Sequence, residues 1–236
     1  MPDPSITRIA ILVNPKAGKG RAQKVLSDVL KQAEEFDLKI FTTNWPESFN
    51  EFSDIFLIGG DGTLNYFINQ YPEIGLPITL FKGGSGNDFA WKLYGNISVK
   101  EHFQNAINSK PKSIDAGTCN GKIFLNGVGI GFDGSIVKSM GAKRFISAGF
   151  IAYLWTVIKH LFFYKEKNLE IKSGDFFQQG RLFMVTVANG SRYGGGFMVS
   201  PGSVINDGLL DLITISKINP LKRIFYLPAM MKGKHL

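Results

Sequence analysis

The sequence contains little cysteine and little histidine. Cys119 is the single cysteine among 236 residues, so an internal disulfide is excluded. The three histidines, His102, His160 and His235, are far apart and have no Cys, Asp or Glu at ligand spacing, which is not the pattern of a zinc site. The first residues lack the charged, apolar and small-residue regions of a secretory signal, and we therefore expect a cytoplasmic protein.

Long apolar runs are also missing. The longest apolar stretch, residues 145–164, is interrupted by Lys159 and His160, whereas a spanning helix needs about 18 or more uncharged apolar residues. We therefore expect no transmembrane segment here. The stretch is expected to form a helix that is either buried on its own domain or in peripheral contact with a membrane. The basic edge and apolar wedge that suit membrane contact are Lys143, Arg144, Phe150, Tyr153, Leu154 and Trp155.

No run of basic residues accompanies the net positive charge. The formal charge is +8 and the isoelectric point about 9.5, which favours an anionic partner such as a nucleotide, a nucleic acid or an acidic membrane. The lysines and arginines occur as singles and pairs, and the aromatic residues lie in apolar segments instead of alternating with clustered cations. We therefore expect no nucleic-acid partner, and a mildly basic soluble surface is the simplest interpretation of the charge.

Residues 1–112 alternate short apolar runs with amphipathic segments, which is typical of a parallel sheet covered by helices. Strands are predicted at 9–13, 38–42, 54–58 and 78–81. Helices are predicted at 20–36, 64–70, after Asp88 and around 99–108. This order predicts a doubly wound α/β domain.

Residues 113–236 have a different character, with more alternating β-formers and tight turns. Asn120-Gly121 between two apolar runs, 114–119 and 122–125, is a strong hairpin signal because both residues tolerate positive φ. Further strands are predicted at 182–188 and 209–216, with one helical insert at 145–164. Pro111 interrupts any helix at the boundary, so we predict a second, β-rich domain from residue 113.

Three glycine-rich loops each follow a predicted strand of the first domain, at the carboxyl ends where open α/β sheets bind ligands. They are residues 14–20, 59–63 and 83–88. The first is not a Walker A loop, and alone it is compatible with an ordinary strand-to-helix turn. The third contains no nucleophile elbow, and Asn87 or Asp88 suits the N-cap of the following helix.

The second loop carries the strongest signal. Gly59, Gly60 and Gly62 surround Asp61, and packing explains this arrangement poorly because each glycine costs backbone entropy. The pattern is expected if a polyphosphate lies against bare backbone while Asp61 holds Mg²⁺ or contacts the proton of the attacking hydroxyl. The alternative is a glycine-rich turn in which Asp61 is a capping residue.

Together these motifs resemble those of the diacylglycerol kinase catalytic-domain family, which includes bacterial lipid kinases and the sphingosine and ceramide kinases. The resemblance rests on Asn14-Pro15 with Gly18, on Gly-Gly-Asp-Gly-Thr at 59–63, and on the segment 84–90. It continues through the second half of the chain at 114–117, 129–133, 189–190, 193–196, Pro201 and 207–208. The resemblance implies an α/β domain followed by a β-rich, sandwich-like domain, with an ATP site at the domain cleft and a lipid pocket in the second domain.

The resemblance also implies roles for individual residues. Asp61 would be catalytic, Asp133 would approach the polar head of the lipid, and Asp207 would match a structural Mg²⁺ position, with an ordinary Asp-Gly turn as its alternative. The nucleotide would contact Asn14, Pro15, Lys16, Ala17, Gly18, Thr43, Gly59, Gly60, Asp61, Gly62, Thr63, Leu64, Asn65, Gly84, Ser85, Asn87 and Asp88.

Two departures from the family pattern bear on activity. Lys82 stands where the family usually has proline, so the third loop is either less rigid or supplied with a cation for a phosphate. The chain stops at Leu236, whereas the family continues to an Asp-Gly-Glu segment whose carboxylates activate the lipid hydroxyl. Losing a positioned general base costs about 10² to 10⁴ in rate, so a catalytically silent nucleotide- or lipid-binding protein is an alternative.

The expected function is an ATP- and Mg²⁺-dependent kinase that transfers the γ-phosphate to a lipid hydroxyl, such as that of diacylglycerol, met at the membrane surface. A homodimer is left open. NAD kinase is a rival because its family resembles this chain at Gly-Gly-Asp-Gly-Thr. A dinucleotide oxidoreductase is disfavoured, because Gly129, Gly131 and Gly134 match its fingerprint but no acidic residue occurs from 134 to 165.

Overall fold

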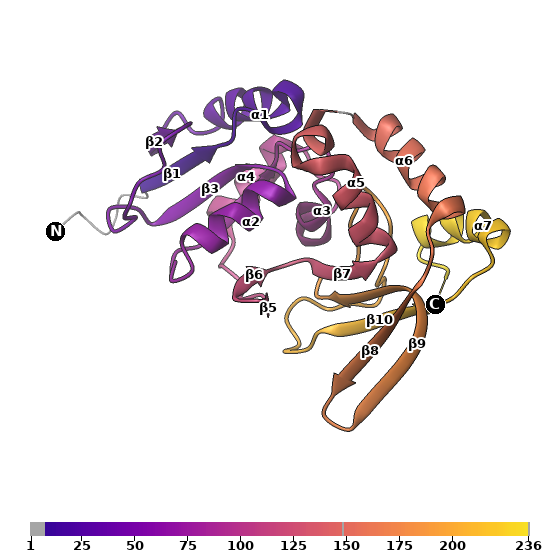
Figure 1. The fold of residues 1–236 in the computed structure, drawn as a ribbon. Helices are drawn as coiled ribbons and strands as arrows, with labels where there is room; N and C mark the ends of the chain where they lie inside the picture. Colours follow the sequence, from indigo (N-terminus) through magenta and orange to yellow (C-terminus); the bar gives the residue numbers. More distant parts are fainter. Residues whose placement is uncertain (1–7, 148, 236) are drawn as a thin grey trace. The chain divides into compact units, whose positions relative to one another are not determined.

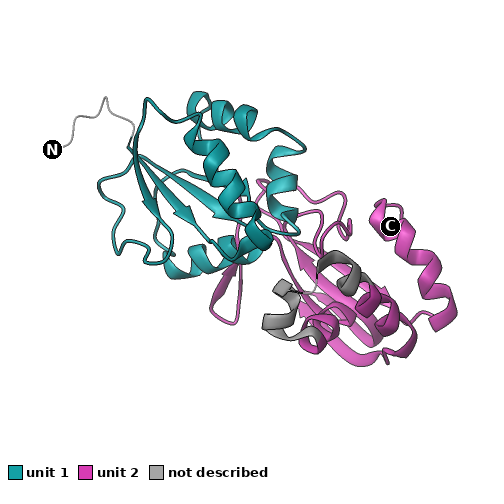
Figure 2. Cartoon of the chain, turned by 90° about the horizontal axis from the view of Figure 1, so that it is seen from above, with its two compact units in different colours: residues 1–113 teal, residues 114–236 magenta. Residues whose placement is uncertain are grey.

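The computed structural model describes the backbone of residues 8–147 and 149–235, and the side chains of residues 8–139 and 155–235 (Figure 1). The chain divides into two packing units, Met1–Ser113 and Ile114–Leu236 (Figure 2). The division falls one residue after the predicted boundary.

The first unit is built on a four-stranded sheet in the order β2-β1-β3-β4, in which every pairing is parallel. The strands are β1 (Arg8–Val13), β2 (Asp37–Phe41), β3 (Asp54–Gly59) and β4 (Ile78–Lys82). The two central strands, β1 and β3, are buried over nearly their whole length, as expected of continuous apolar runs covered on both faces. The predicted α/β class is therefore confirmed.

Short helices connect these strands: η1 (Ala17–Gly20), α1 (Arg21–Leu30), α2 (Asp61–Gln70), α3 (Asp88–Tyr94) and α4 (Val99–Asn108). The helix predicted at 20–36 ends earlier than expected, at Leu30. The chain tightens there into turns, which bury Ala33 and set Phe36 edge-on against Phe103 of α4. Core packing therefore overrides the helical pattern beyond Leu30.

The second unit contains an antiparallel sheet in the order β10-β9-β7, with β8 also paired to β9. Its strands are β7 (Gly127–Gly131), β8 (Lys167–Ser173), β9 (Phe176–Ala188) and β10 (Asp211–Ser216). The paired β8 and β9 extend beyond the rest of the sheet as a long hairpin (Figure 1). The β-rich class is confirmed, although β7 and β8 were not among the predicted strands.

The predicted Asn-Gly hairpin is present as β5 (Gly117–Cys119) and β6 (Lys122–Phe124). Asn120 and Gly121 both have positive φ, 49° and 74°, as a two-residue turn of this kind requires.

Three helices complete the second unit: α5 (Phe132–Ser147), α6 (Gly149–Phe163) and α7 (Pro220–Met231). The single helix predicted at 145–164 is therefore two helices, and α7 was not predicted. Among the described residues, no helix combines the length and apolar character needed to cross a membrane. The predicted membrane wedge at Lys143, Arg144, Phe150, Tyr153 and Leu154 lies outside the described side chains, whereas its last residue, Trp155, is exposed.

Buried aromatic and aliphatic side chains from β9, α5 and α6 form the core of the second unit. One ion pair lies beside this core. Arg223 of α7 donates to Glu166 at 2.5 Å and to the carbonyl oxygens of Leu161 and Tyr164, and it lies over the ring of Phe183. Both charged side chains are more than nine-tenths buried, so this contact fixes the start of α7 against the end of α6.

Candidate functional site

In the first unit, the three glycine-rich loops lie together at the carboxyl ends of β1, β3 and β4. The backbone continues the sheet pairing into the loops, because Asn14 N–H donates to the carbonyl of Ile58 at 3.0 Å and Gly83 N–H donates to that of Gly59 at 2.8 Å. Loops far apart in the sequence are therefore held at one edge, as strand order predicts.

Several of the glycines allow these loops to contact each other. A Cβ on Gly60 would lie 2.9 Å from the Cα of Gly84, and a Cβ on Gly84 would overlap the Cα of Gly60. Gly18 has a φ of +60°, and a Cβ there would overlap the carbonyl oxygen of Gly83. The expectation that packing explains the glycines of the second loop poorly was therefore wrong for Gly59, where a Cβ would overlap the side chain of Thr63, and for Gly60, which approaches the third loop backbone to backbone.

Gly62 is the exception in the second loop. No atom lies within 4 Å of the position that its Cβ would take, and its φ is not in the left-handed region. Neither packing nor backbone conformation requires glycine there. Gly62 leaves bare backbone in the first turn of α2, where free N–H groups and the helix dipole favour an anion.

Asp61 connects the second loop to the third. Its carboxylate accepts hydrogen bonds from the backbone N–H of Asp88 at 3.1 Å and from that of Phe89 at 2.9 Å. These are the first two residues of α3, so Asp61 satisfies amides that have no partner within that helix. The capping alternative is thus observed, but the capped helix is α3 and not the helix that Asp61 begins.

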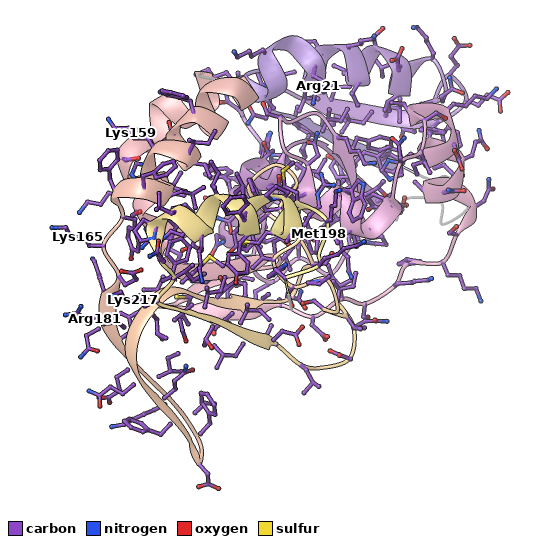
Figure 3. All side chains as sticks on the ribbon, turned by 90° about the vertical axis from the view of Figure 1, so that its right-hand side faces the viewer. Arg21, Lys159, Lys165, Arg181, Met198 and Lys217 are labelled. Atoms are coloured by element: carbon purple, nitrogen blue, oxygen red, sulfur yellow. The ribbon has the colours of Figure 1, made fainter. Side chains whose placement is uncertain are left out.

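Other polar side chains fix the loops. Asn14 Nδ2 donates to Thr63 Oγ1 at 2.9 Å, which ties the first loop to the second. Asn87 is buried and folds the third loop, accepting from Gly84 N–H at 2.8 Å and donating to the carbonyl of Gly84 at 2.9 Å. Arg21 Nη1 donates to the same carbonyl at 2.6 Å (Figure 3). No sequence motif predicts this role for Arg21.

A cavity of about 320 Å³ lies within the first unit, at the ends of β1 and β2 and beside α2. The predicted residues that line it are Asn14, Pro15, Thr43, Gly62 and Thr63. The lining residues that were not predicted are Val13, Thr42, Trp45, Tyr66, Gln70 and Tyr71. Trp45 and Tyr66 meet edge to face. Together with Tyr71 they contribute three aromatic side chains to the lining, which also includes Gly62 and Thr63 in the first turn of α2.

The remaining predicted nucleotide residues lie outside this lining. Ala17 and Leu64 are buried in the core, so their side chains do not face a ligand. Lys16, Asn65 and Ser85 are exposed. The others, which hold the loops together, are Gly18, Gly59, Gly60, Asp61, Gly84, Asn87 and Asp88.

Lys82, at the end of β4, donates to the carbonyl of Gly95 at the end of α3. This bond links β4, the strand before the third loop, to the C-terminal end of α3, the helix after it.

The second unit contains a larger cavity, of about 640 Å³, whose lining is mostly apolar. The backbone of β7 and side chains from β9, β10 and helices α5, α6 and α7 contribute, among them Phe132, Ile136, Leu161, Phe183, Met184, Leu227 and Met230. An apolar cavity of this size with few polar groups is typical of a site for an apolar small molecule.

Asp133 is the carboxylate in this cavity. Its Oδ1 accepts from Gly134 N–H at 2.7 Å, and its Oδ2 accepts from the hydroxyl of Tyr193 at 3.2 Å. Tyr193 is in turn 2.8 Å from Thr186 Oγ1. Gly129 makes room for this arrangement, since a Cβ there would overlap Asp133 Oδ2.

Desolvation raises the pKa of the Asp133 carboxyl, and the hydrogen bonds from Gly134 and Tyr193 oppose that shift. Tyr193 belongs to one of the sequence motifs, but the motif predicts no role for its hydroxyl, and no motif includes Thr186. The clue to their role was weak, because the three residues come from a helix start, a loop and a strand.

Asp207 adopts the turn geometry that was the alternative to its metal role. Its Oδ1 accepts from Leu209 N–H at 3.0 Å, while the neighbouring Gly208 N–H donates to Asp115 Oδ2 at 2.8 Å. Within residues 8–147 and 149–235, no group of three or more His, Cys, Asp or Glu side chains is placed to hold a metal ion. The side chains present therefore do not form an all-protein Mg²⁺ site at Asp207.

Comparison with known proteins gives two family matches that together span most of the chain. Residues 8–119 match the diacylglycerol kinase catalytic domain, and residues 126–236 match the YegS C-terminal NAD kinase beta sandwich-like domain. The chain is 28% identical to the diacylglycerol kinase of Bacillus subtilis, over 97% of this chain and 80% of that protein. It is 31% identical to a "Probable lipid kinase YegS-like" of Pseudomonas putida, over 68% of this chain and 55% of that protein.

The alignments with the YegS-like proteins thus span only about half the length of those relatives. A crystal structure of a diacylglycerol kinase from Bacillus anthracis superposes with a TM-score of 0.72 at 25% identity, over 99% of this chain and 80% of that one.

Proposed function

Because the chain belongs to the diacylglycerol kinase catalytic-domain family, we propose that it transfers the γ-phosphate of ATP to the hydroxyl of a lipid such as diacylglycerol. The observation that carries the proposal is the cavity of about 640 Å³ in the second unit, which is apolar except for a hydrogen-bonded carboxylate and a few other polar groups. Acyl chains fit such a lining, whereas a dinucleotide, the acceptor of an NAD kinase, needs polar partners along its length.

The cavity of the first unit is the proposed nucleotide site. The first turn of α2 offers backbone N–H groups at Gly62, and Lys16 in the first loop is exposed and near enough in sequence to Asn14 to add positive charge. Trp45 and Tyr66 offer aromatic surface for a base. Phosphoryl transfer depends mostly on positioning and charge neutralisation, and this arrangement supplies positioning.

Mg²⁺ would arrive with the nucleotide. The donor set fits that mode of binding, because Mg²⁺ in kinase sites is usually held by one or two carboxylates, phosphates and water, and not by a dedicated protein cage. Asp61 remains the proposed carboxylate: each oxygen accepts one amide hydrogen and retains a second lone pair. When bound, the ion would neutralise phosphate charge.

Asp133 is proposed to bind the lipid hydroxyl. Two hydrogen bonds fix its carboxylate inside an apolar cavity, and an acceptor held in that way can orient a hydroxyl donor. A substrate group bound there would be surrounded by side chains that exclude water.

The test is phosphate transfer from radiolabelled ATP to a panel of lipids and to NAD, using the wild-type chain and Asp133→Asn. We expect transfer to a lipid and a fall of roughly 10- to 100-fold in kcat/KM for the variant, because a charge-assisted hydrogen bond is lost. Transfer to NAD alone would reject the lipid proposal. A melting temperature raised by ATP without transfer to any acceptor would leave a nucleotide-binding protein and reject kinase activity.

A further inference from the structure

Lys82, the last residue of β4, holds the C-terminal end of α3. Its ammonium donates to the carbonyl oxygen of Gly95, which caps this helix, and Lys82 itself pairs in register with Gly59 of β3. Gly95 has a φ of +62°, a backbone conformation that favours glycine. A cation at the C-terminal end of a helix also gains from the helix dipole. The contact therefore joins the carboxyl end of the sheet to the end of α3.

A second contact ties the same end of α3 to the same strand. The hydroxyl oxygen of Tyr94, the last residue of α3, accepts from the backbone N–H of Leu80 at 3.3 Å. The ring of Tyr94 packs on that of the buried His102 of α4, with the ring centroids 4.1 Å apart, and His102 also packs on Phe81 of β4. The C-terminal end of α3 is therefore held against both β4 and α4.

The opposite end of α3 binds Asp61, through the backbone N–H groups of Asp88 and Phe89. With seven residues, α3 is about 10 Å long and well below the roughly 12–15 residues that an isolated helix needs. Its position therefore depends on the contacts at its two ends. A displacement at Gly95 would move the two amides that bind Asp61.

We propose that Lys82 is a positioning residue for phosphoryl transfer and acts on the carboxylate of Asp61 through α3. Gly59 and Lys82 are neighbours in the sheet, and the second loop runs from Gly59 to Asp61. Because Lys82 fixes α3 to this edge, it also fixes the helix start that receives the carboxylate. The use of Asp61 by the nucleotide and its Mg²⁺ rests on the proposed function, whereas the coupling of Lys82 to Asp61 does not.

The positive charge of Lys82 also acts on His102. Burial lowers the pKa of His102 to about 4, and the charge of Lys82 adds to this shift. Tyr94, which contacts the same ring, stays neutral in this range because burial raises its pKa. Lys82→Met should therefore raise the pKa of His102 in a titration followed by NMR. An unchanged pKa would contradict the placement of the ammonium beside this cluster.

The first test of the coupling is hydrogen exchange at the backbone amides of Asp88 and Phe89, without nucleotide. Lys82→Met should speed this exchange by roughly 10- to 100-fold, because a hydrogen bond from a charged donor is lost and α3 opens more often. Lys82→Arg keeps a cationic donor for the Gly95 carbonyl and should restore most of the protection. Lys100→Met is the matched control: it removes an exposed lysine of α4 and should leave both amides as in the wild type.

The second test compares the affinity for ATP with Mg²⁺ present and with EDTA, by isothermal titration calorimetry. Lys82→Met should weaken binding by roughly tenfold when Mg²⁺ is present, as is common for groups that orient the ligands of a metal. It should leave binding in EDTA unchanged. A role in stability alone would lower the melting temperature without changing the ratio of the two affinities. Lys100→Met should bind like the wild type in both conditions.

Equal exchange rates in Lys82→Met and Lys100→Met would overturn the proposal, and so would an equal loss of ATP affinity with and without Mg²⁺. If Lys82→Met does not fold, Tyr94→Phe keeps the ring on His102 but removes the acceptor for the N–H of Leu80. It should speed exchange at the start of α3 by roughly 2- to 10-fold, and unchanged rates would show that the end of α3 does not control its start. A wild type that follows these exchange predictions but phosphorylates no acceptor would reject the kinase proposal and leave the coupling standing.

Discussion

Gly62→Ala should stabilise the protein and weaken its binding of ATP at the same time. Gly62 lies in the first turn of α2, with no positive φ and with open space where a Cβ would be. Alanine in a helix is favoured over glycine by about 0.5–1 kcal/mol. For a unit of this size that gain corresponds to a melting temperature higher by roughly 2–8 °C.

The methyl group would occupy the cavity that Gly62 lines. If a phosphate lies against that backbone, its charge-assisted hydrogen bond to an amide is lost or lengthened, at a cost of about 1.5–3 kcal/mol. The affinity for ATP should then fall by roughly 10- to 100-fold. Isothermal titration calorimetry measures the affinity, and thermal unfolding without ligand measures the stability.

Gly75→Ala is the matched control. Gly75 also has no atom within 4 Å of its Cβ position and no positive φ, but it does not line the cavity. The control should gain about 0.4–1 kcal/mol of stability through the unfolded state and bind ATP like the wild type. If Gly62→Ala binds ATP as tightly as this control, the phosphates do not lie against the first turn of α2, and the assignment of this cavity fails.

Three further changes test the other contacts. Asp61→Ala should lower the free energy of unfolding by about 0.5–2 kcal/mol in urea, because two amides of α3 lose their cap, and Asp61→Asn should restore part of it. Tyr193→Phe removes a donor that favours the charged form of Asp133, so the pKa of that carboxyl should rise and the acid limb of kcat/KM should move to higher pH; an unmoved limb would contradict the contact. Arg223→Met should cost about 3–5 kcal/mol, because Glu166 would remain buried without its partner, and adding Glu166→Leu should recover much of that loss.

The parallel sheet of the first unit could be predicted because its central strands are uninterrupted apolar runs. The strand β7 could not, since Gly127, Gly129 and Gly131 give it low β-propensity. Its glycines are explained only by neighbours distant in sequence: a Cβ on Gly131 would lie 2.6 Å from the carbonyl oxygen of Phe183, and Gly129 makes room for Asp133. Tertiary contact overrides local preference here.

Helix α7 was missed although the sequence carried a signal for its start. Asn219 caps the helix by accepting from Leu221 N–H at 3.0 Å, and Pro220 occupies the first turn, where proline is favoured. Pro228 within the same segment argued against a helix. It lies near the C-terminal end of the helix, which closes at Met231.

The sequence predicted the glycine-rich loops of the candidate site but not the aromatic side chains that line its cavity. The three loops could be found because glycine-rich segments after parallel strands must meet at one edge of the sheet. Trp45, Tyr66 and Tyr71 come from an irregular connection and from one helix, and nothing local indicates that they share a cavity. Such contacts depend on the path of the chain between β2 and β3, which sequence periodicity does not describe.

The glycines of the loops show why a glycine-rich composition alone overstates the case for a bound ligand. Gly18, Gly60 and Gly84 are required by contacts within the protein, so they would be glycine whether or not a phosphate binds. Gly62 is required by no such contact, and it lies on the cavity. A glycine that neither packing nor backbone conformation demands is the better indicator of a bound group, because only the ligand is left to exclude a side chain there.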